Sequence, residues 1–394
     1  MNYIFFDDRA WNNLLPLTYT KPTSEIRIGI LTISEKWKQF FAGTFSHYTQ
    51  DYLSEKYPLK VESKNVLING SVCPSKELTT AIESLPDNTF LIKDGNFIAA
   101  KICSTDIKSI LSETDKIGKR TFDGDLLKIS FPWEIFKYNE QAIIADYENL
   151  TKGRKSQPIG ETNKTINPEN IFIEEGASLL FATLNASTGP IYIGKNSEVM
   201  EGSIIRGPFA LCEHSVLKMA AKIYGPTTIG PHSKVGGEVN NSVIFGYSNK
   251  AHDGFFGNSV LGEWCNLGAD TNNSNLKNNY EEVKLWSYPQ ERFVKTGLQF
   301  CGLIMGDHSK CGINTMFNTG TVVGVSANIF GDGFPRNFIP SFSWGGANGF
   351  QQYTTNKAIE VAEKVYARRE LPLTDIDKNI LKHIHELDAK WRNF

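Results

Sequence analysis

The sequence predicts a parallel β-solenoid in the second half of the chain, with an α/β domain before it and helices after it. The solenoid follows from an apolar position that recurs every six residues, a period that fits neither an α-helix nor an isolated strand. The α/β domain follows from apolar runs at 3–6, 66–69 and 90–93 separated by polar, helix-compatible stretches. The helices follow from segments rich in Ala, Glu, Lys and Leu after residue 350.

The six-residue repeat is the strongest signal in the chain. An accidental period is the alternative in a chain with 40% hydrophobic residues, but eight consecutive Ile, Leu or Val residues are hard to reach by chance. The first run is Ile193, Val199, Ile205, Leu211, Leu217, Ile223, Ile229 and Val235. After a break at 236–260 the repeat returns at Leu261 and Leu267. After a second break at 271–302 it returns at Met305, Cys311, Phe317, Val323 and Ile329. Each strand of the coil should therefore send one aliphatic side chain into the interior.

Changes of composition divide the chain into four parts. Residues 1–150 form the predicted α/β domain, and the polar stretch 151–164 reads as a linker because it combines charges with Gly and Pro. The solenoid is expected over 165–350. Residues 351–394 are expected to form a helical cap, since the last coil of a solenoid otherwise leaves an apolar end and an unpaired edge.

Composition excludes several classes of partner. With 41 basic and 43 acidic side chains the formal charge is −2, so neither nucleic acid nor an anionic membrane is indicated. No apolar run is long enough to span a membrane and no signal peptide is evident, which leads us to expect a cytoplasmic protein. The six cysteines lack the spacing of a zinc or redox site and read as small core residues.

Candidate chemistry is densest in the first break of the repeat. His252 lies there between Lys250 and Asp253, and an imidazole titrates close enough to neutral pH to act as a general base. The alternative is a surface histidine in a turn. The second break opens with amide-rich residues, 271–280, and is long for a loop in a compact domain. Its aromatic side chains, such as Trp286, indicate that it packs on another surface, for example a neighbouring subunit.

The combination of hexapeptide repeats, a histidine in the break and an Asn-rich loop resembles a known bifunctional family. That family combines glucosamine-1-phosphate acetyltransferase with N-acetylglucosamine-1-phosphate uridylyltransferase. The N-terminal stretch 15–29, with Pro-Leu-Thr followed by Lys-Pro, is similar to the opening loop of sugar-phosphate nucleotidyltransferases. The stretches 248–253 and 271–277 resemble the short-headed branch of the family found in Bacteroidetes-type bacteria. The resemblance implies a nucleotidyltransferase-like head and a left-handed parallel β-helix of hexapeptide repeats.

The resemblance also implies an acetyl-transfer site. His252 would be the general base that takes a proton from the sugar amine, with Asn275 and Lys250 beside it as catalytic residues. Acetyl-coenzyme A would be the acetyl donor, in a groove that the family completes with an adjacent subunit, so a homotrimer is implied. The donor site would include Asn266, Ala269 and Lys277. Two positions depart from the family pattern: Phe255 replaces a tyrosine and Asp270 replaces a glycine.

In the head, the resemblance implies nucleotide and metal sites. Arg9, Lys21 and Arg27 would contact phosphates, and Asp7 and Asp8 would hold Mg²⁺ if the head is active. The segment 7–13 contains no glycine, although the family cradles phosphates with a Gly-rich loop. Ser71 stands where the family has a magnesium-binding Asp.

Three functions remain open from the sequence. The first is synthesis of UDP-N-acetylglucosamine, by acetylation of glucosamine 1-phosphate and uridylylation of the product. The second is a non-catalytic trimeric scaffold that binds a nucleotide sugar. The third is an acetyltransferase for another amino sugar, because residue spacing does not encode the identity of the acceptor.

Overall fold

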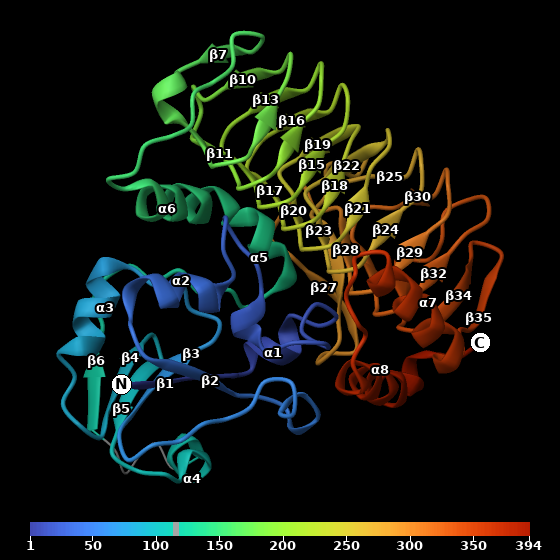
Figure 1. Cartoon of the computed structure of the whole chain (residues 1–394). Coiled ribbons are helices and arrows are strands. Elements are labelled where there is room, and N and C mark those ends of the chain that lie inside the picture. The colour runs from blue at the N-terminus through green and yellow to red at the C-terminus, as the bar shows by residue number, and fades with distance from the viewer. Residues whose placement is uncertain (113–117) are drawn as a thin grey trace. The chain divides into compact units, whose positions relative to one another are not determined.

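A computed structural model describes residues 1–112 and 118–394 (Figure 1). The chain forms two compact units. The first consists of Met1–Leu14, Thr20–Ile26 and Leu31–Ser130, and the second of Leu15–Tyr19, Arg27–Ile30 and Phe131–Phe394. The boundary after Ser130 precedes the predicted one near residue 150, so the two helices before the linker group with the solenoid.

The first unit is built on one six-stranded mixed sheet with strand order β2-β1-β3-β5-β4-β6. Its strands are β1 (Asn2–Phe6), β2 (Thr44–Tyr48), β3 (Asn65–Asn69), β4 (Thr89–Lys93), β5 (Asn96–Ile102) and β6 (Gly118–Thr121). Its helices are α1 (Ala10–Asn13), α2 (Ile33–Phe40), α3 (Lys76–Glu83) and α4 (Ile107–Ser112). Strands β1, β2 and β3 are parallel, so their carboxyl ends meet at one edge of the sheet.

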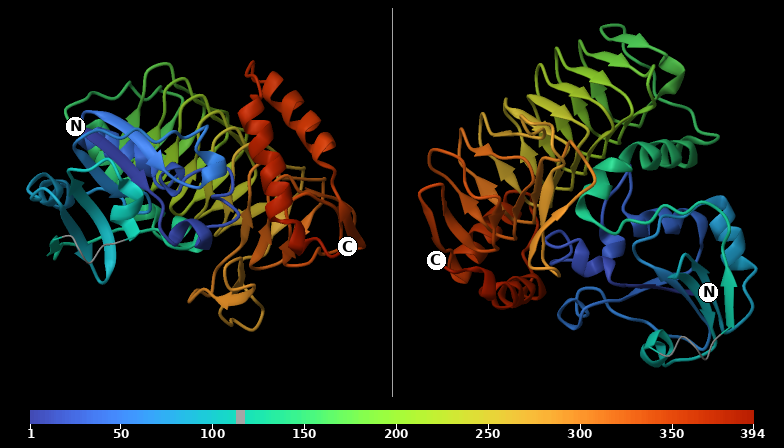
Figure 2. Two further views of the ribbon diagram at one scale, coloured as in Figure 1. Left: turned by 90° about the horizontal axis from the view of Figure 1, so that it is seen from below. Right: turned by 180° about the vertical axis from the view of Figure 1, so that it is seen from behind.

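The second unit contains the predicted solenoid, a left-handed parallel β-helix whose coils stack three sheets (Figures 1 and 2). The nine-stranded sheet, here called the first face, contains β8 (Ile171–Ile173), β11 (Ile191–Ile193), β14 (Phe209–Leu211), β17 (Thr227–Ile229), β20 (Val243–Ile244), β23 (Val260–Leu261), β28 (Leu303–Met305), β31 (Thr321–Val323) and β33 (Phe338–Ile339). The ten-stranded second face contains β9 (Ser178–Leu179), β12 (Glu198–Val199), β15 (Val216–Leu217), β18 (Lys234–Val235), β21 (Asn249–Lys250), β24 (Asn266–Leu267), β29 (Lys310–Cys311), β32 (Asn328–Ile329), β34 (Ser343–Gly346) and β35 (Gly349–Gln352). The six-stranded third face contains β7 (Lys164–Ile166), β10 (Thr183–Asn185), β13 (Ile204–Arg206), β16 (Lys222–Tyr224), β19 (Glu238–Asn240) and β22 (Phe255–Gly257), and the pair β25 (Asn272–Asn273) and β30 (Met316–Phe317) follows it.

The interior of the β-helix confirms the six-residue repeat. Every interior position predicted from the sequence belongs to one buried core cluster, from Ile193 in the first run to Ile329 in the second. Register explains the packing, because equivalent side chains of successive coils pair directly, as Val199 does with Leu217 and Leu217 with Val235. Each coil therefore buries its apolar side chains against those of its neighbours.

The three faces of the β-helix differ in what covers them. The first face packs against α5 (Pro132–Lys137) and α6 (Asn139–Thr151), where the Asn139 side chain donates to Thr228 Oγ1 at 3.1 Å. The second face carries α7 (Thr355–Ala367), where Tyr366 stacks on Trp264 at 3.8 Å, and α8 (Asp375–Leu387) follows. The two predicted helices are present, but α7 packs beside coils that precede the last one. The third face exposes apolar side chains on three of its strands, namely Ile166, Ile204 and Tyr224.

The second break in the repeat forms a hairpin of β26 (Lys284–Ser287) and β27 (Arg292–Lys295). The indole of Trp286 stacks on the Phe338 ring, with centroids 4.3 Å apart, and meets the Trp391 indole edge-on. The excursion thus packs on the last coils and the C-terminus of its own chain. No helix in the described ranges is both long and apolar enough to cross a membrane.

Adjacent residues of β13 allow a test of the interior packing. Ile205 is fully buried, whereas 55% of Ile204 is exposed. We expect Ile205→Ala to lower the free energy of unfolding by about 2–5 kcal/mol, because the substitution removes buried methyl groups and leaves a cavity. Ile204→Ala should cost clearly less, because this side chain fills no space in the interior of the β-helix. Denaturant titration followed by far-UV circular dichroism measures both, and equal losses would contradict the assignment of the interior.

Candidate active sites

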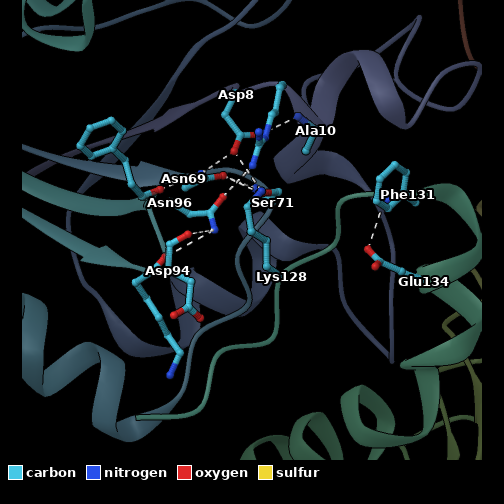
Figure 3. Close-up of polar contacts among 12 residues, drawn as sticks. Asp8, Ala10, Asn69, Ser71, Asp94, Asn96, Lys128, Phe131 and Glu134 are labelled. Atoms are coloured by element: carbon cyan, nitrogen blue, oxygen red, sulfur yellow. Dashed lines mark hydrogen bonds and ion pairs between the residues drawn. The ribbon is translucent and has the colours of Figure 1, made fainter. Parts of the chain in front are cut away.

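Polar side chains converge at the carboxyl edge of the parallel strands in the first unit (Figure 3). Asp8 follows β1, Asn69 ends β3 and Ser71 follows it, so the topology alone brings them together. The Lys128 ammonium lies 2.9 Å from Asp8 Oδ2 and donates to Ser71 Oγ at 2.6 Å. Asn69 donates to Asp8 Oδ2 at 3.0 Å and accepts from the Ser71 hydroxyl at 2.6 Å. These four side chains form a closed network, called the head network below.

The head network fixes the charge of Asp8. Burial raises the pKa of the Asp8 carboxyl, but the Lys128 ammonium and the hydrogen bond from Asn69 outweigh burial and leave this pKa below its ordinary value. Ser71 places a hydroxyl where the resembled family has a carboxylate, and that hydroxyl accepts a hydrogen bond from Lys128. The edge of the sheet therefore holds a matched anion and cation beside a neutral side chain.

Asp7 has a different environment from its neighbour. One of its carboxylate oxygens accepts a hydrogen bond from the Thr23 amide at 2.9 Å, and the other accepts from the Thr49 hydroxyl at 2.5 Å. Burial raises the pKa of Asp7 to about 6 in spite of these bonds. Asp7 thus ties the segment after Pro22 to the sheet, while Asp8 faces the more open side.

The three predicted phosphate contacts lie in different surroundings. Arg9 reaches Asn96 Oδ1 at 3.5 Å on the exposed rim of the head network. Lys21 is buried in the first unit, where its carbonyl accepts a hydrogen bond from the Trp11 indole at 3.3 Å. Arg27 belongs to the second unit, is buried, and donates to the carbonyl of Ile30. Of the three predicted phosphate contacts, Arg9 is therefore the one that lies beside the head network.

Replacing Lys128 with methionine tests the head network. Lys128→Met should leave the Asp8 carboxylate partly buried without its cation. We expect the free energy of unfolding to fall by about 1–3 kcal/mol, a value between those typical of surface and of buried ion pairs. The pKa of Asp8 should rise, because burial is then opposed only by the hydrogen bonds from Asn69 and the Ala10 amide. Stability at pH 7 and the carboxyl titration of Asp8 by NMR measure the two effects.

The control is Lys64→Met, which breaks the Lys64–Asp87 pair at 2.8 Å in the same unit. Both of its side chains are exposed, so we expect no measurable loss of stability. An Asp8 titration unchanged in Lys128→Met would contradict the role assigned to this ion pair.

In the β-helix, His252 lies in the turn that joins the second face to the third. This turn follows β21 and precedes β22, and the imidazole is exposed. In the next coil Ala269 and Asp270 lie alongside, since the Asp270 amide donates to the Asp253 carbonyl at 3.0 Å. Asn266 pairs with Asn249 on the second face, and their side-chain amides are 3.5 Å apart. The structure thus brings His252 and Ala269 to one corner of two adjacent coils, and places Asn266 on the strand that leads to this corner.

Lys250 lies beneath this corner, inside the β-helix. Its position in β21 pairs with the interior Val235, and only 2% of the residue is exposed. The ammonium donates to the carbonyl oxygen of His252 at 2.6 Å. Burial lowers the pKa of Lys250 to about 8, although the carboxylates of Asp253 and Asp270 act in the opposite direction. A lysine at an aliphatic position of the repeat thus fastens the His252 turn from within.

Two glycines make the turn possible. Gly237 has φ +72°, and a Cβ there would lie 2.8 Å from the His252 carbonyl oxygen and 3.0 Å from the Lys250 ammonium. Gly254 has φ +114°, and a Cβ there would overlap the Thr271 carbonyl. Any larger residue would strain the backbone and displace the turn. The path of the chain around His252 therefore depends on the coils before and after it.

The other predicted acetyl-transfer residues lie beyond β22. Asn275 donates to the side chain of Asn258 at 2.8 Å, just after that strand ends. Lys277 donates to the Glu282 carbonyl at 3.1 Å within the excursion. Neighbouring amides hold β22 itself, because Asn272 accepts from the Phe255 amide at 2.7 Å and Asn273 from the Gly257 amide at 3.0 Å. Asn275 and Lys277 are consequently not at the His252 corner of the same chain.

Lys250 gives a prediction with a definite sign. Because its pKa in the folded protein, about 8, lies below that of an unfolded lysine, the unfolded chain binds more protons between these values and stability rises with pH there. Relative to Lys250→Met, the wild type should gain stability, on the order of 2 kcal/mol, between pH 8 and pH 10. Paired unfolding curves at several pH values measure this difference, and parallel pH profiles would contradict the buried, partly neutralised lysine.

Sequence comparison supports the reading of the head. Residues 3–155 match the family described as Sugar nucleotidyl transferase, so the N-terminal part of the chain is a sugar nucleotidyltransferase-like domain, as predicted. A bifunctional sugar-1-phosphate nucleotidylyltransferase/acetyltransferase of Sulfurisphaera tokodaii is 27% identical over 261 residues, which are 65% of this chain and 58% of that protein. The bifunctional protein GlmU of Methanococcus aeolicus is 30% identical over 134 residues, which are 34% of this chain and 27% of that protein. The similarity therefore spans less than two thirds of either relative.

Solved structures similar to the chain include two acyltransferases. The polysialic-acid-specific acetyltransferase NeuO is 13% identical, with a TM-score of 0.26, over 53% of this chain and 94% of that one. The UDP-N-acetylglucosamine acyltransferase LpxA of Bacteroides fragilis is 13% identical, with a TM-score of 0.23, over 57% of this chain and 96% of that one.

Proposed function

We propose that the chain is a bifunctional transferase of sugar 1-phosphates, in which the β-helix transfers an acetyl group and the head transfers a nucleotidyl group. The observation that carries the proposal is the His252 corner, where an exposed imidazole lies beside the Ala269–Asp270 turn of the adjacent coil and its backbone is held from inside by Lys250. The head match and the bifunctional relatives support the second activity. The proposed acceptor is glucosamine 1-phosphate and the proposed donor is acetyl-coenzyme A.

In the proposed acetyl transfer, the amine nitrogen of the sugar attacks the thioester carbonyl. A carbon–nitrogen bond forms, the carbon–sulfur bond breaks, and His252 takes the proton that the amine loses and returns it to the departing thiolate. Asn266 would orient the donor or the acceptor through its exposed amide. Lys250 would act as a positioning residue, because it holds the backbone of His252 and is itself buried.

In the proposed nucleotidyl transfer, a phosphate oxygen of the sugar 1-phosphate attacks the α-phosphorus of UTP, and pyrophosphate leaves. Arg9 and Lys128 are the cations at the carboxyl edge of the sheet that would offset the charge of the phosphates. Mg²⁺ would be held by Asp8 together with the nucleotide phosphates, since such sites often use one or two carboxylates. Asp7, whose oxygens accept hydrogen bonds from Thr23 and Thr49, would hold the backbone that carries Asp8.

The distribution of residues in the β-helix supports a site shared between copies of the chain. His252 precedes β22 and Asn275 follows β25, which continues it in the next coil, so about 10 Å of strand separates the two corners. One small acceptor cannot contact both within one chain. The exposed apolar side chains of the third face are available for contact between β-helices. We therefore propose a homotrimer in which one copy contributes His252 and another contributes Asn275.

The first test separates the two activities on purified protein. Free thiol is followed with acetyl-coenzyme A and glucosamine 1-phosphate, and pyrophosphate is followed with UTP, Mg²⁺ and N-acetylglucosamine 1-phosphate. His252→Ala should lower thiol release by about 10²–10⁴-fold, the usual contribution of a general base, and leave pyrophosphate release unchanged. His214→Ala, an exposed histidine in a turn of an earlier coil, is the control and should keep both. Unchanged thiol release in His252→Ala would refute the assignment, and absence of both activities in the wild type would favour the nucleotide-sugar-binding scaffold.

A subunit-mixing experiment tests the shared site. His252→Ala and Asn275→Ala chains should each be inactive in acetyl transfer, and unfolding and reassembling them together should restore part of the activity, because some sites then contain both residues. Sedimentation at each step gives the number of chains per particle. Failure of the mixture to recover activity, with wild-type chains recovering under the same treatment, would exclude a site built from two copies.

A further inference from the structure

A pocket of about 450 Å³ lies between helix α7 and the second face of the β-helix. Its lining consists of Lys234, Tyr247, Asn249, Ala251, Trp264, Cys265, Asn266, Lys310, Val365, Arg368 and Arg369. All of these residues belong to the second unit. No local pattern in the sequence predicts this pocket, because its walls come from four successive coils and from a helix that follows them in the chain. The size is that of a small-molecule site.

Four cationic side chains line the pocket, and the charges of three of them are not neutralised by an ion pair in the part of the chain that the structure describes. Lys234, Arg368 and Arg369 form no ion pair with any residue in the described ranges. Arg369 makes only a long contact, 3.5 Å, to Asn249 Oδ1. Burial lowers the pKa of Arg369, and the neighbouring Arg368 adds to this effect.

The fourth cation is engaged. Lys310 donates to the His308 carbonyl at 2.8 Å. Two acidic side chains, Glu213 and Glu263, are close enough to help raise the pKa of Tyr247, but neither lines the pocket. The pocket therefore presents a net positive field that an anion would relieve.

Stacked rings hold α7 in place over the pocket. Tyr247 stacks on Trp264 with centroids 4.2 Å apart, and Tyr366 of α7 stacks on Trp264 at 3.8 Å. Both faces of the Trp264 ring are consequently occupied, so a ligand meets the edges of these rings and finds no free stacking surface. Recognition in this pocket falls to the cations and to the Asn249 and Asn266 amides.

From this geometry we infer that the α7 pocket binds the phosphate groups of a nucleotide-type ligand. Guanidinium groups bind phosphate oxygens in a forked geometry, and Arg368 and Arg369 offer two such groups opposite Lys234. Ala251, which precedes His252 in the chain, is part of the lining, so the phosphate-bearing part of an acetyl donor is one source of this chemistry. A uridine nucleotide is another source. The inference rests on the proposed function only for the identity of the ligand.

The test is binding without turnover, measured by calorimetry on the full chain with coenzyme A, UTP and inorganic pyrophosphate as separate probes. Arg368→Gln should weaken at least one probe about 10-fold, and Arg368→Gln combined with Arg369→Gln should weaken it further. Lys357→Gln removes one charge from the exposed side of the same helix, outside the pocket, and should change nothing. These substitutions lie outside the head and should not change binding of UTP there. A loss of affinity that occurs only in the arginine variants would therefore support the pocket.

The pattern of losses identifies the source of the phosphates. A loss confined to coenzyme A identifies the acyl donor, a loss confined to UTP identifies a uridine nucleotide, and a loss for all three identifies a general diphosphate site. Affinities that are unchanged for every probe, or lowered equally by Lys357→Gln, would overturn the inference. His252→Ala should retain all three affinities, so that failure of acetyl transfer and failure of the pocket remain distinguishable.

Discussion

Contact between equivalent side chains in successive coils is the interaction on which the rest of the second unit depends. Each strand of the β-helix is only two to four residues long, too short to be stable alone, and gains its stability from the coils on either side. The interior stack sets the spacing between coils. That spacing in turn places His252 next to Ala269, and it brings the Gly254 backbone against the Thr271 carbonyl. The candidate chemistry at the corner is therefore a product of the stacking.

In the first unit, candidate site residues are positioned by the sheet topology and by an ion pair. Its parallel strands deliver Asp8 and Asn69 to one edge of the sheet, and Lys128 arrives from a segment far along the chain. The ion pair and the Ser71 hydroxyl form a network in which each polar group has a partner, which holds the side chains in one arrangement. Electrostatic pairing thus positions the side chains at this edge, as apolar stacking positions the turns of the coils.

The parts of the fold that the sequence predicted are those with a local period. Ile193 to Val235 repeat within one window, and the closing helices have a continuous helix-forming composition. The candidate sites were predictable only in part. His252 and Asn266 stand out as polar residues near the break. The inward position of Lys250 could not be predicted, because a charged side chain is expected to face solvent. Lys128 lies 120 residues from its partner Asp8, a separation at which no local pattern carries information.

The interior lysine has a consequence for how the β-helix behaves as a whole. A solenoid is close to a one-dimensional array in which cooperativity passes only from coil to coil. Lys250 replaces an aliphatic contact between Val235 and the following coil with a buried amine, and so weakens one link of that chain of contacts. Helix α7 spans this link, because the pocket beneath it is lined by Lys234 from the coil before Lys250 and by Lys310 from a later coil. The helix thus joins coils on both sides of the buried amine and supports the segment that carries the candidate catalytic corner.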